Sequence, residues 1–330
     1  MQQDNSRGYT ALHAGAGLID RSRLGRIVLT GADRRSYLQG LLTNDIAALT
    51  AGTGCYAALL TAQGRMIADM RVLELGDAVL LDVSPIAAAT VRAHLERFVF
   101  SEDVEVRDVT GERGEIGVYG PGAVAIVSRL ANASVDHLPL FGSVQASFDG
   151  SPLLAVRSDE AGVDGYDLIV DRAAVEALTA ALIDAGGVPV DDEAAEAVRI
   201  EAGRPRFGQD MTEETIPLEA GIEDRAISRT KGCYVGQEVI IRVVDRGQGR
   251  VARRLVGLML PPEAPVPAAG AHIASGARAI GRVTSATRSP ALGRPIALGY
   301  VHRDFVSPGT EVTVGETPAV VAAIPFAGTS

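Results

Sequence analysis

A strand-like segment followed by an amphipathic helix occurs twice in this sequence, and this repetition limits the folds that the chain can adopt. Residues 26–30 (RIVLT) precede a helix that Asp33 can cap, and residues 166–170 (YDLIV) precede a helix that Asp171 can cap and that runs through Ala185. Neither unit contains the glycine-rich phosphate loop of a dinucleotide-binding fold. We therefore expect an α+β fold with two related lobes built on antiparallel sheets.

The segment after the first helix predicts an antiparallel meander. Two stretches rich in alternating apolar residues, 55–62 and 65–73, are broken at Gln63 and Gly64, and a turn at Gly76 and Asp77 leads to a third run at 78–83. Ser84 and Pro85 are typical of an N-cap and a first helical turn, so the next helix is expected to begin there.

The C-terminal part of the chain has a different pattern. From residue 251 onward, short apolar runs alternate with Gly and Pro turns, which is typical of a small β-barrel. We therefore divide the 330 residues into a region of two intertwined lobes, residues 1–250, and a barrel domain, residues 251–330.

Composition narrows the class of function. The formal charge of −10 opposes attraction to phosphate backbones and to anionic membrane surfaces, so neither direct nucleic-acid binding nor membrane binding is expected. The sequence shows no secretory signal and no apolar run of about 18 residues, which indicates a cytoplasmic protein. The five histidines lack metal-ligand spacing, and no metal site is expected.

The octet KGCYVGQE at residues 231–238 holds one of the two cysteines between glycine and an aromatic residue. Gly232 can give the backbone unusual freedom, and the Lys231 ammonium can favour the thiolate of Cys233. Such a thiol is a candidate nucleophile or metal ligand. The alternative is that Cys233 is a small buried hydrophobe, and Cys55, in an apolar run, is expected in the core.

A helix capped by Asp191 is expected to end at Gly203, which places Glu201 in its last turn. A carboxylate there faces the negative end of the helix dipole. Two interpretations follow: either Arg204 or Arg206 neutralises Glu201, or Glu201 accepts two hydrogen bonds from an amino-heterocycle.

Several segments together resemble the YgfZ family of folate-binding proteins, which are related to the glycine-cleavage T-protein, an aminomethyltransferase. The segments span almost the whole chain: residues 29–33 (LTGAD), 39–45 (QGLLTND), 199–205 (RIEAGRP), 217–220 (PLEA), 231–238 (KGCYVGQE), 289–293 (SPALG) and 296–300 (IALGY).

The resemblance implies a three-lobed fold around a central channel for tetrahydrofolate or a one-carbon derivative, with a role in assembling or repairing iron–sulfur clusters. The implied partners are reduced folate and iron–sulfur client enzymes or assembly factors. Glu201 takes the place of the pterin-binding glutamate, and a basic residue near the folate falls around Arg229 or Lys231. Cys233 becomes the essential residue, with Lys231 and Tyr234 shaping its surroundings.

The remaining motif residues form a loop: Gly232, Gly236, Gln237 and Glu238. The residues after Gly236 leave two alternatives open, because their β-branched side chains favour a strand while the resemblance points to a helix.

One departure from the T-protein pattern affects the expected chemistry. T-protein carries two adjacent acids after a glycine pair, whereas this sequence has Ala68 followed by Asp69. Asp69 remains the candidate general base or electrostatic stabiliser for one-carbon transfer. The alternatives to the iron–sulfur role are therefore a folate-dependent aminomethyl or methyl transferase of the T-protein type, and a non-catalytic interaction scaffold.

Overall fold

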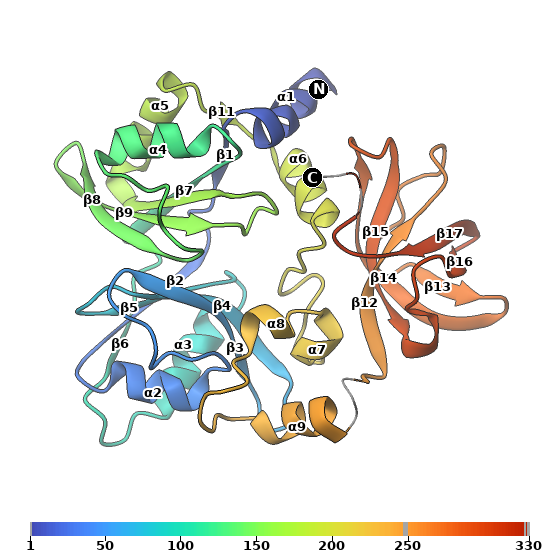
Figure 1. Ribbon diagram of the computed structural model, residues 1–330, viewed down its shortest axis with the longest axis horizontal. Helices are drawn as coiled ribbons and strands as arrows, with labels where there is room; N and C mark the ends of the chain where they lie inside the picture. The colour runs from blue at the N-terminus through green and yellow to red at the C-terminus, as the bar shows by residue number, and fades with distance from the viewer. Residues whose placement is uncertain (1, 247–249, 327, 329–330) are drawn as a thin grey trace.

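The computed structural model describes residues 2–246, 250–326 and 328. Two α+β lobes lie one above the other, and a β-barrel stands beside both (Figure 1). The helices of the connecting segment lie between the lobes and the barrel, so three units surround the middle of the molecule (Figure 1). The α+β class, the antiparallel sheets and the C-terminal barrel are as predicted.

The first lobe is a five-stranded antiparallel sheet in the order β3-β4-β5-β2-β6. Helices α2 and α3 cover it, and their apolar faces meet the sheet in one hydrophobic cluster. The predicted meander is confirmed, because β3, β4 and β5 pair in sequence order as antiparallel neighbours. Both faces of these strands are buried over much of their length. The bounds are β2 Gly25–Thr30, α2 Arg34–Leu41, β3 Thr53–Leu60, β4 Met66–Glu74, β5 Val79–Val83, α3 Ala88–Arg97 and β6 Glu105–Asp108.

The second lobe is a six-stranded sheet in the order β11-β1-β7-β10-β9-β8. Its pairs are antiparallel except β1 with β11, which is a short parallel pair. Helices α4 and α5 pack on it, and α1 lies near the short pair. The bounds are α1 Gln2–Ala14, β1 Gly17–Asp20, β7 Arg113–Tyr119, α4 Ala123–Ala131, β8 Ser143–Phe148, β9 Ser151–Ser158, β10 Gly165–Asp171, α5 Val175–Asp184 and β11 Val188–Pro189.

The C-terminal strands close into a barrel in the order β12-β15-β14-β13-β16-β17, around a core of mainly Val, Leu and Ile. The division of the chain at residue 250 into independent domains stays a prediction. The bounds are β12 Arg253–Met259, β13 His272–Ser275, β14 Arg278–Ser289, β15 Arg294–His302, β16 Glu311–Val314 and β17 Thr317–Ala322.

The segment between the second lobe and the barrel carries α6 Asp192–Glu201, α7 Pro217–Ala220, α8 Glu223–Ala226 and α9 Gln237–Ile241. Asp191 caps α6 as predicted, since its Oδ1 accepts a hydrogen bond of 2.7 Å from the Ala194 amide. Gly236 adopts φ +84° and α9 follows it, so the helix that the resemblance indicated is present and the strand is not.

Two predicted helix starts are confirmed, but without the predicted caps. Asp33 and Asp171 stand at the N-cap positions, yet Asp33 accepts a hydrogen bond from the Asp103 amide and Asp171 pairs with Arg113. The start predicted at Ser84 is wrong, because the helix begins at Ala88 and the Ser84 hydroxyl donates to the Phe207 carbonyl at 3.5 Å. In each case the side chain expected to cap the helix has another partner.

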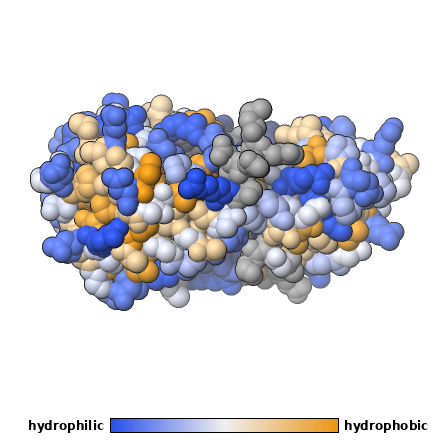
Figure 2. Space-filling model, turned by 90° about the horizontal axis from the view of Figure 1, so that it is seen from above, coloured by the Kyte–Doolittle hydropathy of each residue, from blue (hydrophilic) through white to orange (hydrophobic). Residues whose placement is uncertain are grey.

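On the outer surface, Figure 2 shows polar and apolar side chains interspersed over the face seen from above. Among the described residues, no helix is long and apolar enough to cross a membrane.

A buried cluster of charges joins the two lobes. Arg71 of β4 donates to Asp167 of β10 and lies 2.9 Å from Glu115 of β7, and it also pairs with Asp82 of the neighbouring strand β5. Arg26 of β2 reaches the second oxygen of Glu115 at 2.8 Å. Burial alone would raise the pKa of Glu115, but its arginine partners lower it to about 2. The contact therefore joins the lobes through two buried arginines of the first lobe, Arg26 and Arg71, and two buried acids of the second, Glu115 and Asp167.

We predict that Glu115→Gln lowers the free energy of unfolding by about 3–5 kcal/mol, because it leaves buried arginines without their counter-charge. Denaturant unfolding measures the change. Glu112→Gln is the matched control: Glu112 pairs with Arg107 at the surface, with both side chains more than half exposed, so we expect a loss below about 1 kcal/mol. Equal effects of the two substitutions would contradict the assignment.

Candidate active site

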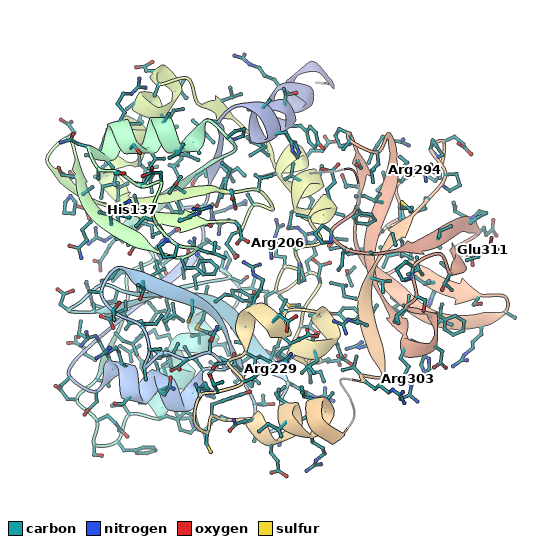
Figure 3. The ribbon with its side chains drawn as sticks, viewed as in Figure 1. His137, Arg206, Arg229, Arg294, Arg303 and Glu311 are labelled. Carbon is teal, nitrogen blue, oxygen red and sulfur yellow. The ribbon has the colours of Figure 1, made fainter. Side chains whose placement is uncertain are left out.

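A cavity of about 700 Å³ opens between the lobes, bordered by β4, β5 and α6 and by the loops that follow β1, β9 and α6. Figure 3 shows Arg206, one of its lining residues, in the middle of the molecule between the lobes and the barrel. The lining combines carboxylates, arginines and a few apolar side chains: Asp20, Asp69, Asp82, Glu160, Asp192 and Glu196; Arg21, Arg23, Arg71, Arg199, Arg204, Arg206 and Arg225; and Ile19, Leu24, Tyr56, Met70, Val83, Phe207 and Ile222.

Asp69 lies in this cavity because β4 alternates its faces. Asp69 and Arg71 point to the cavity side, while Ala68 is fully buried in the core of the first lobe. An acid at position 68 would point into that core, so the alanine there removes no carboxylate from the cavity.

The Asp69 carboxylate has a defined hydrogen bond and a perturbed pKa. The Tyr56 hydroxyl donates to Asp69 Oδ2 at 2.5 Å. Burial and the nearby charge of Glu160 raise the pKa of Asp69 to about 6, and the Tyr56 hydrogen bond opposes this rise. A carboxyl with such a pKa changes its protonation state close to neutral pH, as acid–base catalysis requires.

Arg225 of α8 holds the other side of Tyr56. Its guanidinium lies 5.2 Å from the centre of the Tyr56 ring and 5.9 Å from that of Phe141. Its Nη2 donates to Asp159 Oδ1 at 2.7 Å and to Glu160 Oε1 at 3.1 Å. Asp69, Tyr56, Arg225 and Glu160 thus form one connected chain that crosses the cavity from the first lobe to the second.

The structure does not place Glu201 in this cavity. Glu201 is 2% exposed, its Oε2 accepts a 2.8 Å hydrogen bond from Tyr9 of α1, and its Oε1 accepts one from Ser289 of β14. The partners predicted for it were wrong, because Arg204 pairs with Asp159 and Arg206 pairs with Glu196. Glu201 joins α6 to the N-terminal helix and the barrel.

Arg229 is also outside the cavity lining. Its side chain is 65% exposed and pairs with Asp224, and Figure 3 shows it near α8 and α9 rather than beside Arg206. The cavity arginine of this segment is Arg225, which sequence reasoning missed. The adjacent acids Asp159 and Glu160 were a usable signal, since both half-buried carboxylates pair with this arginine.

The expectation that Lys231 activates Cys233 is wrong. The Lys231 ammonium donates to three main-chain carbonyls at the end of α2, those of Gln39, Leu42 and Asn44, at 2.7, 2.5 and 2.9 Å. Its Nζ also lies 5.1 Å from the centre of the buried Tyr234 ring. Burial lowers the pKa of Lys231 to about 8. A cation at a helix C-terminus satisfies carbonyls that the helix leaves free. Lys231 is the single lysine among the 31 Lys and Arg residues, a signal that sequence reasoning overlooked.

Cys233 is exposed rather than a buried hydrophobe, and Cys55 is only partly buried at the edge of the core.

Gly232 has no positive φ and has open space around its α-carbon, so its predicted conformational role is not used. Gly236 is needed, because a Cβ there would lie 2.5 Å from the Thr61 carbonyl oxygen. Gln237 begins α9, and Glu238 forms an exposed pair with Arg242. The motif loop therefore packs against the β3–β4 turn and leaves its thiol outside.

Two α+β lobes with a cavity lined by acids and arginines between them, and a barrel beside both, define a three-lobed protein. Two protein-family models match the chain. The GCVT N-terminal domain matches residues 1–231, and the glycine cleavage T-protein C-terminal barrel domain matches residues 253–326. The chain belongs to the glycine cleavage T-protein family.

Named relatives agree with this assignment. Proteins named aminomethyltransferase from Streptomyces avermitilis and Synechocystis sp. are 32% and 33% identical; the alignments cover 96% and 93% of this chain and 88% and 82% of the relatives. The crystal structure of glycine cleavage system aminomethyltransferase T from Bartonella henselae is 26% identical with a TM-score of 0.88, covering 98% of this chain and 89% of that chain. These matches establish the glycine cleavage T-protein family, and they do not separate the YgfZ branch from the aminomethyltransferases.

We predict that Tyr56→Phe raises the pKa of Asp69 from about 6 by about one further unit, because the lost hydrogen bond stabilised the carboxylate. A carbon-13 NMR titration of aspartate carboxyls measures the shift. Tyr37→Phe is the control, since its hydroxyl bonds the Leu95 carbonyl instead. In the wild type, the folded-state pKa of Asp69 exceeds the unfolded value, so its contribution to stability is lost as pH rises through 6. An unchanged titration in Tyr56→Phe would refute the interaction.

Proposed function

We propose that this chain is a folate-dependent one-carbon transferase of the aminomethyl type, which binds a reduced folate in the cavity between its lobes. The observation that carries the proposal is Asp69, held by Tyr56 inside that cavity in a chain whose relatives are named aminomethyltransferase. Tetrahydrofolate, or a one-carbon derivative of it, is the substrate that the proposal requires.

The cavity suits such a ligand. Its volume of about 700 Å³ lies within the range of small-molecule sites. Tyr56, Met70, Phe207 and Ile222 provide apolar surface for a ring, which this chain must supply without tryptophan. The cavity arginines provide partners for the carboxylates of a folate tail.

Each residue of the connected chain has a part in transfer. Asp69, ionised above pH 6, would accept the proton that a folate nitrogen loses as it bonds to the aminomethyl carbon, while the bond from that carbon to its amine breaks and the amine leaves as ammonia. The same carboxylate would otherwise stabilise positive charge on the aminomethyl donor. Tyr56 orients that carboxylate, and Arg225 fixes Tyr56 from its other face. The buried charges around Arg71 keep β4, and hence Asp69, in place against the second lobe.

We expect Asp69→Asn to lower the turnover number at least about 100-fold, because the carboxylate is lost while the amide keeps the shape and the bond to Tyr56. The dissociation constant of tetrahydrofolate should change less than about 3-fold. Formation of methylenetetrahydrofolate from an aminomethylated carrier protein measures turnover. Asp77→Asn, in the exposed turn between β4 and β5, is the control. Wild-type turnover in Asp69→Asn would sink the proposed role.

A melting experiment separates this proposal from a non-catalytic scaffold. Tetrahydrofolate at 100 times its dissociation constant stabilises a binding protein by about 2.7 kcal/mol. A reduced folate that leaves the melting temperature unchanged would favour the scaffold.

The second candidate is the YgfZ-type role, support of iron–sulfur enzymes through the Cys233 thiol. Its supporting observation is that Cys233 is exposed on a loop anchored by Lys231. The proposed transferase predicts that Cys233→Ser keeps turnover within about 2-fold of wild type, since the thiol is not part of the cavity lining. Cells that lack this protein test the alternative: iron–sulfur enzyme activity under oxidative stress, restored by wild type but not by Cys233→Ser, would establish the thiol role.

A further inference from the structure

A second hollow lies next to the cavity between the lobes. It is a groove of about 680 Å³, bordered by the β3–β4 turn, by α3 and by the loop after α6. Ile67 of the groove stands two positions before Asp69 of the cavity, so about 7 Å of strand β4 separates the two hollows. The wall between them is therefore about one layer of side chains thick at β4. The groove is lined by Thr61, Met66, Ile67, Ala89, Thr90, Ala93, His94, Arg97 and Glu213.

Two further segments run from the cavity to the groove. In the segment from β5 into α3, Pro85 lines the cavity and Ala89 lines the groove. In the loop after α6, Phe207 lines the cavity and Glu213 lines the groove. The residues between these positions therefore form part of the wall that separates the hollows.

The two segments touch at the contact of Ser84 and Ile86 with Phe207 and Gly208, which we call the seam. The Ser84 hydroxyl donates to the Phe207 carbonyl at 3.5 Å, which is long for a hydrogen bond. Ile86 lies across Gly208 so closely that a Cβ on Gly208 would be 2.1 Å from Ile86 Cδ1. A glycine at position 208 therefore leaves the space that the Ile86 side chain occupies.

The seam is a weak border of the cavity. Ile86 is 67% exposed, so its contact with Gly208 buries little apolar surface and contributes little to the free energy of folding. The border between the two lobes is held instead by the buried charges around Arg71. Because the seam has few buried contacts, it opens at a lower cost in free energy than the lobe contact does.

The glycine side of the seam is fixed in place. The Gly208 amide donates to the Met211 carbonyl at 2.7 Å, and the Arg206 carbonyl accepts from the amides of Gln209, Asp210 and Met211. The Asp210 carboxylate accepts hydrogen bonds from β14, which holds this turn against the barrel. An exposed side chain, in contrast, changes its rotamer within nanoseconds, so Ile86 is the part of the seam that is free to move.

We infer that the seam opens to admit and release the reduced folate, and that Ile86, lying across the bare α-carbon of Gly208, is the gate that closes it. This inference rests on the proposed function and adds a route for its ligand. The route leads from the outer groove, past Ile86, into the cavity beside Asp69. Closure behind the ligand also excludes water from the reacting atoms.

Binding rates distinguish a gate from a ligand contact. A gate sets the barrier that the ligand crosses in both directions, so its removal raises the association and dissociation rate constants by the same factor and leaves Kd unchanged. Loss of a ligand contact raises mainly the dissociation rate constant. We expect Ile86→Ala to raise both rate constants for tetrahydrofolate about 3- to 10-fold, with a change in Kd below about 2-fold.

Stopped-flow mixing of the full chain with tetrahydrofolate, followed by tyrosine fluorescence, measures both rate constants. Ile183→Ala is the matched control, because Ile183 of α5 is also an exposed isoleucine, at 44%, and lines neither hollow. It should keep both rate constants of the wild type.

Gly208→Ala tests the same contact from its other side. The new Cβ would meet the flexible end of Ile86, so we expect it to displace that side chain and to raise both rate constants. Added to Ile86→Ala, the same substitution should cause no further increase, because the contact is already lost. Thermal melting checks the fold of each variant, since an alanine at the φ of +90° found at Gly208 is strained.

Unchanged rate constants in Ile86→Ala overturn the inference and leave the proposed function intact. An increase in the dissociation rate constant alone makes Ile86 a ligand contact and also overturns the gate. A wild type that binds no reduced folate overturns the proposed function and this inference together.

Discussion

The buried contact of Arg71 with Glu115 and Asp167 is the interaction on which the rest of the structure depends. It joins β4 of one lobe to β7 and β10 of the other through side chains that are all buried. Asp69 stands two residues before Arg71 on the same face of β4, so the contact that joins the lobes also sets the wall of the cavity. Removing Arg71 or one of its acids would leave an uncompensated charge in the buried contact. The association of the lobes and the geometry of the site therefore depend on the same residues.

The third unit is attached by a different kind of contact. Glu201 ends α6 and accepts hydrogen bonds from Tyr9 of α1 and Ser289 of the barrel. On another face of the same helix, Arg199 pairs with Glu196 and Asp210. Arg199 also donates to Ser285 of β14 at 2.9 Å, so this helix of ten residues both lines the cavity and attaches the barrel. The bonds to Tyr9 and Ser289 therefore explain the position of Glu201 in the last turn of α6, and no ligand is needed to explain it.

Sequence reasoning found the strands in residues 55–83 because apolar runs are separated there by turn residues, although both faces of these strands are largely buried. It failed where a distant group competed with a near one. Asp33 was expected to cap its helix, but the Asp103 amide, seventy residues away, took its carboxylate. Lys231 was expected beside Cys233, two residues away, but its ammonium reached three carbonyls near residue 40.

The candidate site was predicted in part for the same reason. Asp69 was found because the sequence resembles the T-protein pattern after Gly64. Arg225 carries no local pattern, and it meets Tyr56 and Glu160 only through the fold. Tertiary pairing of this kind is invisible to periodicity, although a pair of acids such as Asp159 and Glu160 does signal that a cation must lie near them.

The single lysine has a consequence for the chemistry that this protein meets. Formaldehyde and iminium carbon condense with free, unprotonated amines. Every other cationic side chain here except histidine is a guanidinium, which stays protonated, and the one ammonium is 9% exposed and engaged with three carbonyls. The folded chain therefore offers almost no side-chain amine to an activated one-carbon unit, and a mass shift at Lys231 under formaldehyde treatment would report that its loop has come away from α2.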